Sequence, residues 1–256
     1  MLIPDSGSSF RMLEPQASIE KALDVLRHLH GEGRPCGPSE IGRALELPRS
    51  TVHRLLAALG RRGFVEQDAH GLYQPGIALV ALGLGVLERE PVVAAARPVL
   101  EREAEALGET MFLAAARGGR LVVLDKVEGT GFLRAEPRVG AEIPAHATAI
   151  GKLYLAFAPE QVRVETPATA FTARTRTGSA LAREVASARA LGVAENREEW
   201  IAGLAGVAAP VRLGGRLVAA LSATGPAARM REREHFCARV VAAAHDVSAR
   251  LEGTRI

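Results

Sequence analysis

Apolar residues between positions 39 and 63 recur with the spacing of two short helices joined by a tight turn. Ile41 and Leu45 lie four residues apart, and Leu47-Pro48 follows them as the turn. In the next segment, apolar side chains stand at i, i+3, i+4 and i+7, which places them on one face of a helix. These are Val52, Leu55, Leu56 and Leu59. The pattern predicts a helix-turn-helix, and the plain alternative is a helical pair with a solvated basic face.

The following residues predict a β-hairpin. Residues 63–68 alternate apolar and polar side chains, as a strand does, and residues 72–74 are expected to form the second strand. Between them, residues 69–71 favour a turn in which Gly71 takes a positive φ. A helix is expected before the pair, from Ser18 as N-cap to His30, with Gly31 after its end. Its expected core face is Ile19, Ala22, Leu23, Leu26 and Leu29. The whole predicts a winged helix-turn-helix DNA-binding domain over residues 16–75.

Polar residues near the start of the second helix are the expected contacts to bases. Arg54 could donate to a guanine edge or, equally, to a phosphate. Ser50 and Thr51 could instead cap the helix. The helix set is Ser50, Thr51, His53 and Arg54. Ser39 and Arg49 are expected to contact the DNA backbone. Arg61, Arg62 and His70 are expected to meet phosphates near the wing, or else to be solvated surface.

The remaining pattern predicts a linker helix and a second domain. Residues 77–88 are apolar nearly all round, which favours a linker helix (76–90) that packs on its copy in a dimer or on its own chain. Residues 91–256 then mix helical and β-prone runs, an α+β arrangement. Helices are expected at 92–107 (kinked or restarted near Pro98), 146–157, 181–191 and 230–251, and strands at 110–116, 120–127, 131–138, around Val193, and at 204–211 and 216–224.

Composition narrows the class of protein. With 48% hydrophobic and 24% charged residues, both parts are expected to be globular, and a net charge of +3 permits nucleic-acid binding without requiring it. Basic and acidic residues are nearly equal in number in residues 16–75, so the DNA-binding signal is the local arginine cluster and not the charge of the whole segment. Residues 1–15 read as a disordered tail without a targeting signal, and no apolar run suits a membrane span, so a cytoplasmic protein is expected. Two isolated cysteines, Cys36 and Cys237, indicate neither a metal site nor a disulfide, and no cofactor is expected.

Several ordered blocks resemble the IclR-type transcriptional regulators. They are SIEKALDVLRHL, LPRSTVHRLLAAL, GFVEQDAHGLYQPG, VGAEIPAHATAIGKLYLAF, the run FTARTRTGSALAREVASARALGVAENREEWIAGLAGVAAPV, and LSATGP. The resemblance implies a winged helix-turn-helix joined by a linker helix to a GAF-like α/β effector-binding domain. It also implies homodimers that pair into homotetramers and regulate catabolic operons.

The resemblance further implies an effector site. Small-acid-binding members use backbone amides that correspond here to Ala149 and Ile150, and polar positions that correspond to Asn196, Gly206, Ser222 and Thr224. Ser222 and Thr224 alternate on one strand and so face the same side, although they could instead satisfy local backbone groups. Asn196 and Gly206 stand where the small-keto-acid sensors are expected to have an acid and a thiol. With Ile150, these departures favour a larger, more apolar carboxylic acid, aromatic in character, over glyoxylate or pyruvate.

The expected function is a transcriptional regulator, a repressor, that binds a palindromic operator under the control of a small organic acid. The alternatives are a constitutive DNA binder whose sensor domain has lost its ligand, and an enzyme with a DNA-binding appendage. The enzyme is disfavoured because Ser222-Ala223-Thr224-Gly225 is no nucleophile elbow. Lys152 likewise lacks the other residues of a phosphate-binding loop.

Overall fold

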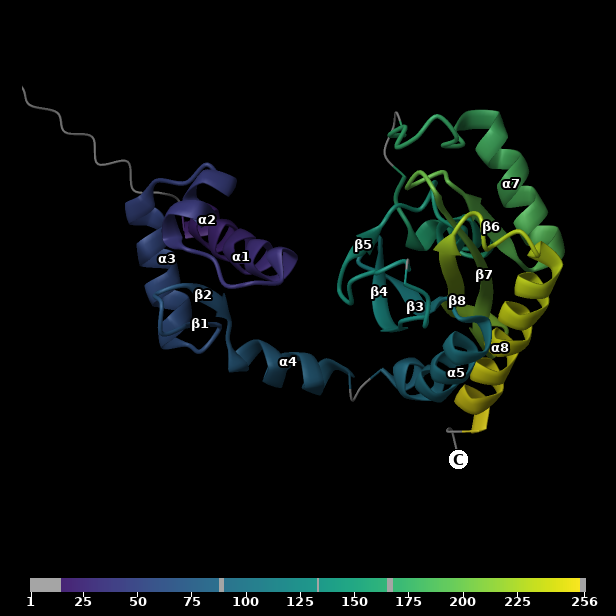
Figure 1. The fold of residues 1–256 in the computed structure, drawn as a ribbon, viewed down its shortest axis with the longest axis horizontal. Coiled ribbons are helices and arrows are strands. Elements are labelled where there is room, and N and C mark those ends of the chain that lie inside the picture. The colour runs from purple at the N-terminus through teal and green to yellow at the C-terminus, as the bar shows by residue number, and fades with distance from the viewer. Residues whose placement is uncertain (1–14, 88–89, 133, 165–167, 254–256) are drawn as a thin grey trace, which may run out of the picture. The chain divides into compact units, whose positions relative to one another are not determined.

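The protein folds as two compact units, Met1–Arg89 and Glu90–Ile256, each with its own apolar core (Figure 1). The computed structural model describes residues 15–87, 90–132, 134–164 and 168–253. The tail expected at 1–15 lies outside the described residues except for Pro15, which begins the first helix.

Three helices form the core of the N-terminal unit: α1 (Pro15–Glu32), α2 (Pro38–Ala44) and α3 (Arg49–Arg61). The predicted stripe of α3 faces inward, since Val52 and Leu56 are almost completely buried and Leu55 is 5% exposed. These side chains pack against Val25, Leu29 and Ile41 of the two preceding helices. The helix pair predicted from the apolar spacing is therefore present.

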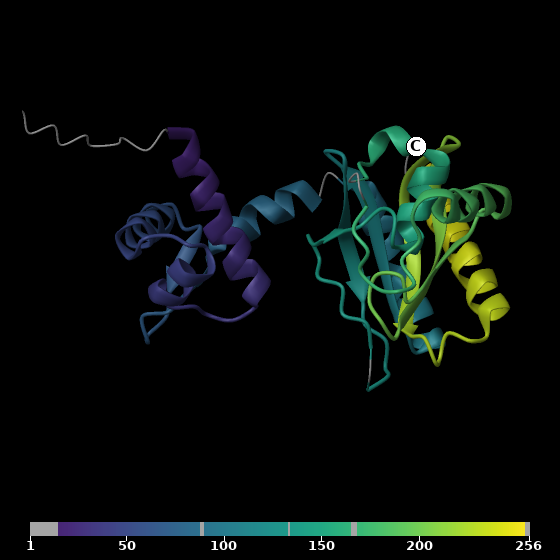
Figure 2. The same cartoon turned by 90° about the horizontal axis from the view of Figure 1, so that it is seen from above.

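The first helix differs from its prediction. α1 begins before Ser18 and continues through Gly31, so neither residue marks an end of the helix (Figure 2 shows α1 along its full length). Leu29 is buried as expected, but Ile19 and Leu23 are 63% and 54% exposed. A helical period reveals an apolar face without revealing what covers it.

The predicted hairpin consists of β1 (Val65–Gln67) and β2 (Tyr73–Pro75), paired in antiparallel fashion. Asp68 holds the turn, because its Oδ1 accepts from the backbone N–H groups of His70 (2.8 Å) and Leu72 (2.9 Å). Gly71 has a φ of 80°, which confirms the expected left-handed position.

An apolar helix, α4 (Ile77–Leu87), follows the hairpin. Five of its large apolar side chains are each more than half exposed, although burying such side chains is normally favourable. They are Ile77, Val80, Leu82, Leu84 and Val86.

The described strands of the C-terminal unit form one antiparallel sheet in the order β5-β4-β3-β8-β7-β6. Their bounds are β3 (Thr110–Arg117), β4 (Arg120–Val127), β5 (Glu142–Ile143), β6 (Ala194–Arg197), β7 (Leu204–Leu213) and β8 (Arg216–Pro226). The long pair β7 and β8 carries alternate side chains to opposite faces, and each face contributes to a separate apolar cluster.

Helices cover both faces of this sheet. α5 (Pro91–Leu107) and α8 (Arg233–Gly253) lie side by side in Figure 1 and bury residues such as Leu100 and Val240 on one face. α6 (Ala149–Phe157) packs Ile150 and Leu153 against the other face, where α7 (Gly178–Leu191) and the short turn η1 (Pro159–Gln161) adjoin it. The predicted two-domain α+β fold is thus confirmed.

Two local predictions in the C-terminal unit were wrong. No strand occupies the described residues of 131–138, where Pro137 has no N–H to pair. Ala135 O accepts from Thr110 Oγ1 (2.7 Å). The helix expected from His146 begins at Ala149. α5 continues through Pro98, so the restart considered there is absent and the other alternative, a kink, stays a prediction. Among the helices described, none is long and apolar enough to cross a membrane.

Candidate functional site

The N-terminal half of α3 presents polar side chains to solvent, opposite its buried face. Arg49, Ser50, His53 and Arg54 are exposed, and Thr51 is half-buried. Pro48 occupies the N-cap position and no side chain caps the helix, so the capping role considered for Ser50 and Thr51 is not seen. The first N–H groups of a helix without a side-chain cap remain available to an anion.

The other predicted DNA contacts are also on the surface of this unit. Ser39 lies in the first turn of α2, Arg61 and Arg62 at the end of α3, and His70 at the tip of the hairpin. All four side chains are exposed. Within the described chain, none of the nine predicted side chains forms a hydrogen bond or an ion pair, so all are free to meet a partner.

A cavity of about 120 Å³ lies in the C-terminal unit between the start of α6 and the strands β6, β7 and β8. It brings together all six residues predicted for the effector site: Ala149, Ile150, Asn196, Gly206, Ser222 and Thr224. Most of the remaining wall is apolar and comes from Phe112, Ile143, Trp200, Ile201 and Leu204. Among its described lining residues none is basic, and Glu136 is the one acid.

The start of α6 is held rigidly beside this cavity. Thr148 is the N-cap; its Oγ1 accepts from Gly151 N (3.0 Å) and donates to Pro144 O (2.8 Å). Gly151 also allows the helix to approach the preceding segment, since a Cβ there would lie 2.0 Å from Ala145 O. The N–H groups of Ala149 and Ile150 precede the first intrahelical bonds and have no partner within the helix.

Three neighbouring strands contribute one polar row. Asn196 pairs with Gly206, and Gly206 pairs with Thr224, so the three positions share one face of the sheet. Thr224 Oγ1 lies 3.2 Å from Ser222 Oγ, which in turn donates to Val207 O (2.9 Å). A Cβ on Gly206 would lie 2.7 Å from Thr224 Oγ1, so the missing side chain is what allows the Thr224 hydroxyl to sit over the middle of the row.

A buried ion pair lies behind the cavity wall. Lys152 Nζ, on α6, donates to Glu199 Oε1 (2.7 Å) and to Glu195 O (2.8 Å). The lysine and glutamate side chains are only 1% and 4% exposed. Lys152 therefore joins the helix of the cavity to the edge strand β6 and to the loop after it.

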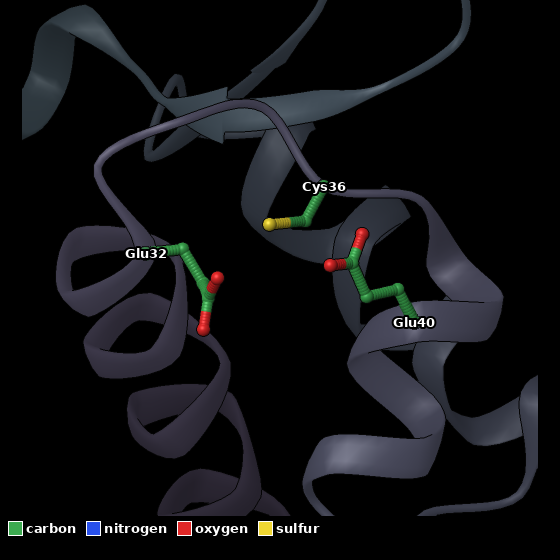
Figure 3. A group of neighbouring side chains, drawn as sticks. All are labelled: Glu32, Cys36 and Glu40. Atoms are coloured by element: carbon green, nitrogen blue, oxygen red, sulfur yellow. The ribbon is translucent and has the colours of Figure 1, made fainter.

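A second polar cluster lies where α1 approaches α2. Figure 3 shows the side chains of Glu32, Cys36 and Glu40 turned toward one another, and their ligand-type atoms lie within 4.8 Å. Arg34 already neutralises the carboxylates: it pairs with Glu40, and its Nη2 lies 3.3 Å from Glu32 Oε2. The hydrogen bond from Arg34 lowers the pKa of Glu40, whereas burial raises the pKa of the Cys36 thiol and keeps it protonated. The arrangement is an ion-paired corner of the fold.

Comparison with known proteins decides the family. Residues 84–249 match the family described as bacterial transcriptional regulator IclR C-terminal, and residues 18–69 match the IclR helix-turn-helix domain. The chain belongs to the IclR family of transcriptional regulators.

Curated relatives of this IclR-family chain are regulators and not enzymes. The glycerol operon regulatory protein of Streptomyces griseus is 35% identical over 237 residues, which cover 91% of this chain and 93% of that protein. The HTH-type transcriptional repressor AllR of Escherichia coli is 29% identical over 222 residues, covering 84% and 82%.

Solved structures share the fold. The IclR protein of Thermotoga maritima superposes with a TM-score of 0.74 at 28% identity, covering 93% of this chain and 99% of that one. An IclR homolog from Microbacterium hydrocarbonoxydans, complexed with 4-hydroxybenzoate, gives a TM-score of 0.79 at 25% identity, covering 92% and 99%.

Several residues that line the cavity of this IclR-family protein were not predicted from the sequence. Thr148 had a signal, because a threonine directly before an apolar helical run is a typical N-cap. Trp200 and Phe112 had none, since an aromatic residue in a loop or strand does not reveal which cavity it lines. The same is true of the irregular segment 135–137, which was taken as part of a strand.

Replacement of the buried lysine tests its structural role. Lys152→Met leaves Glu199 as an unpaired buried carboxylate and should lower the free energy of unfolding by about 3–5 kcal/mol. The chain has a single tryptophan, Trp200, so its fluorescence during urea unfolding reports on the C-terminal unit. The matched control, Lys126→Met, breaks a more exposed pair with Glu128 and should cost about 1 kcal/mol or less. Equal losses in the two variants would contradict this role.

Proposed function

We propose that this IclR-family protein is a repressor whose operator binding is controlled by a small, largely apolar organic acid. The observation that carries the proposal is that one cavity gathers the free amides of α6 and the polar row of β6, β7 and β8. The operator would be palindromic, with half-sites spaced by one helical turn or a multiple of it, and would be bound by two copies of the chain.

The exposed half of α3 supplies the proposed reading surface. Arg54 stands on the face opposite Leu55 and Leu56 and has a free guanidinium, which can donate two hydrogen bonds to a guanine in the major groove. Arg49 and Ser39 would fix the helix on the phosphates, as would Arg61, Arg62 and His70 beside the wing. Ser50, Thr51 and His53 would complete the contacts of α3.

The start of α6 supplies the proposed carboxylate site. A helix N-terminus carries a partial positive charge, and the N–H groups of Ala149 and Ile150 can donate to an anion. Thr148 already satisfies Gly151 N, which leaves the two preceding amides for the ligand. Because the described lining contains no basic side chain, these amides are the principal positive potential in the cavity.

The size and walls of the cavity favour a compact acid with an apolar body. A cavity of about 120 Å³ is well above the roughly 10–15 Å³ that a single water molecule needs, so it can hold a compact organic acid. Glyoxylate and pyruvate would leave much of the apolar wall uncovered. The homolog that is complexed with 4-hydroxybenzoate has the same fold, and an aromatic monocarboxylate of that size fits the proposal.

The exposed apolar helix α4 supplies the proposed contact between copies. Its five uncovered side chains, together with Ile19 and Leu23 of α1, belong to the N-terminal unit and would lose their exposure in a dimer. Two copies are also what a palindromic operator requires. Further pairing of dimers into tetramers is part of the same proposal.

A single arginine tests the reading surface. Arg54→Ala should raise the operator Kd about 5- to 150-fold, the equivalent of about 1–3 kcal/mol, and relax the preference at one base pair. The measurement is fluorescence anisotropy with a DNA fragment selected from a random pool, repeated at several salt concentrations. Arg27→Ala, an exposed arginine of α1 outside the predicted surface, is the control and should leave the Kd unchanged. Equal weakening on operator and random DNA would make Arg54 a phosphate contact.

Ligand titration tests effector control. An aromatic monocarboxylate should quench or enhance the fluorescence of Trp200, which lines the cavity, and at 100 times its Kd should stabilise the fold by about 2.7 kcal/mol. The same ligand should weaken operator binding about 5- to 150-fold, as expected for a coupling of about 1–3 kcal/mol. If no small acid changes operator binding, the chain is the constitutive regulator considered from its sequence.

Charge on α4 tests the dimer contact. Leu82→Glu should shift the mass of the protein toward that of a monomer in sedimentation or light scattering, because a carboxylate opposes burial of the face. The control is Leu191→Glu, which changes an equally exposed leucine on α7 and should leave the mass unchanged. A Leu82→Glu protein of unchanged mass would place the contact between copies elsewhere.

A further inference from the structure

A second cavity in the C-terminal unit is polar and positively charged. It measures about 330 Å³ and lies between α7, β6 and the first residue of α8. Its described lining contains four arginines and three glutamates: Arg176, Arg183, Arg197, Arg233, Glu184, Glu195 and Glu199. With Lys152 behind the lining, five positive and three negative side chains give this group a net charge of +2. The proposed effector cavity, in contrast, has no basic side chain in its described lining.

The carboxylates of this second cavity are already paired with cations. Lys152 Nζ donates to Glu199 Oε1 (2.7 Å) and lies 3.5 Å from Glu184 Oε2. The carboxylate of Glu195 pairs with two of the arginines, one on β6 and the other at the start of α8. The excess positive charge therefore belongs to the two arginines that remain.

These two arginines, Arg176 and Arg183, are free to bind an anion. Both are exposed, and within the described chain neither forms a hydrogen bond or an ion pair. A guanidinium presents its N–H groups as a planar fork that matches the oxygens of a phosphate or a carboxylate. Two free forks and a net charge of +2 suit a dianion better than a monoanion. A phosphate monoester carries about −1.5 to −2 charges at pH 7, whereas a carboxylate carries one.

One oxygen of the Glu199 carboxylate lacks a hydrogen bond. Glu199 lines the second cavity and its side chain is 4% exposed; Oε1 accepts from Lys152, but within the described chain the buried Oε2 has no donor. The residue cannot easily turn away, because its backbone N–H donates to Asn196 Oδ1 (2.9 Å). A buried acceptor without a donor is unfavourable, so a ligand that donates to Oε2 is favoured. A neutral hydroxyl can do this without adding to the positive charge of the site, whereas an ammonium group cannot.

We propose that the second cavity binds phosphate monoesters that carry a hydroxyl, such as those of a sugar or another polyol. Arg176 and Arg183 hold the phosphate, and a ligand hydroxyl donates to Glu199 Oε2. The site is separate from the proposed effector cavity, whose described lining includes none of these three residues. Because Glu199 also holds Lys152, such a ligand contacts the ion pair that fixes α6.

Calorimetric titration of the full-length protein tests this site. The hydroxylated probes are glycerol 2-phosphate and ribose 5-phosphate. Isopropyl phosphate has the carbon skeleton of glycerol 2-phosphate without its hydroxyls, and glycerol and ribose lack the phosphate. Each probe is titrated into wild type and into the double variant Arg176→Ala/Arg183→Ala.

A second double variant, Arg163→Ala/Arg216→Ala, is the control with the same change in net charge. It removes two arginines that are exposed, that are unpaired within the described chain, and that do not line the second cavity. Circular dichroism and operator binding without ligand establish that each variant is folded. If Arg176→Ala/Arg183→Ala does not fold, the two single variants take its place.

In wild type and in the control, at least one hydroxylated monoester should bind about tenfold or more tightly than isopropyl phosphate, because a site built for a hydroxyl rejects the analogue that lacks it. It should also bind about tenfold or more tightly than the corresponding polyol without phosphate. In Arg176→Ala/Arg183→Ala the affinity for that monoester should fall about tenfold or more, since hydrogen bonds between charged groups are among the strongest that side chains make.

Three results would overturn the inference. The wild-type protein could bind no phosphate monoester, or it could bind isopropyl phosphate as tightly as both hydroxylated esters. The third is an Arg176→Ala/Arg183→Ala protein that binds the monoester as tightly as the control does. None of these results bears on effector control, which the titration with aromatic acids tests separately.

Discussion

The buried ion pair between Lys152 and Glu199 is the contact on which the arrangement of the C-terminal unit depends. It joins α6, which offers backbone amides, to the end of β6, which offers the amide of Asn196. Such a pair adds little net stability compared with apolar residues of the same volume, but removing one partner leaves a buried charge. Its consequence is therefore geometric: two hydrogen-bonding groups from distant parts of the sequence stay in fixed positions across one small cavity.

The cavity itself follows from a change of side-chain character along the sheet. Toward one end, β7 and β8 carry small and apolar residues such as Ala208 and Ala220, on which α6 packs closely. At Gly206 and Thr224 the same face turns polar and loses volume, so the helix above it begins over an opening. Close packing and a cavity thus coexist on one face because side-chain size and polarity change over a short stretch of β7 and β8.

Apolar periodicity predicted most helices and strands, because a buried face forces the spacing that the sequence displays. It could not show that Ile19 and Leu23 stay exposed, since a face covered by a second chain has the same spacing as one covered by its own. The strand expected at 131–138 is absent from the described residues there, where Pro137 has no N–H to pair and Ala135 O accepts from the side chain of Thr110. The six cavity residues came from family resemblance, whereas Trp200 and the orientation of Asn196 depend on contacts between distant segments that no local pattern encodes.

Effector control requires that a ligand in the cavity change the free energy of elements next to the linker, and magnitudes indicate which contacts can carry that change. α5 begins directly after the linker and is tied to the sheet by Arg117 with Glu90 (2.6 Å) and by Arg97 with Asp125 (2.8 Å). Partly exposed pairs of this kind contribute about 1 kcal/mol or less each, which is short of the coupling of about 1–3 kcal/mol that regulation typically needs. The apolar packing of α5 on β3 and its neighbours contributes more free energy than these ion pairs. It involves Val92, Ala96, Val99 and Leu100. A ligand that shifts the sheet under α5 would therefore act through this apolar contact, while the ion pairs hold α5 in position along the sheet.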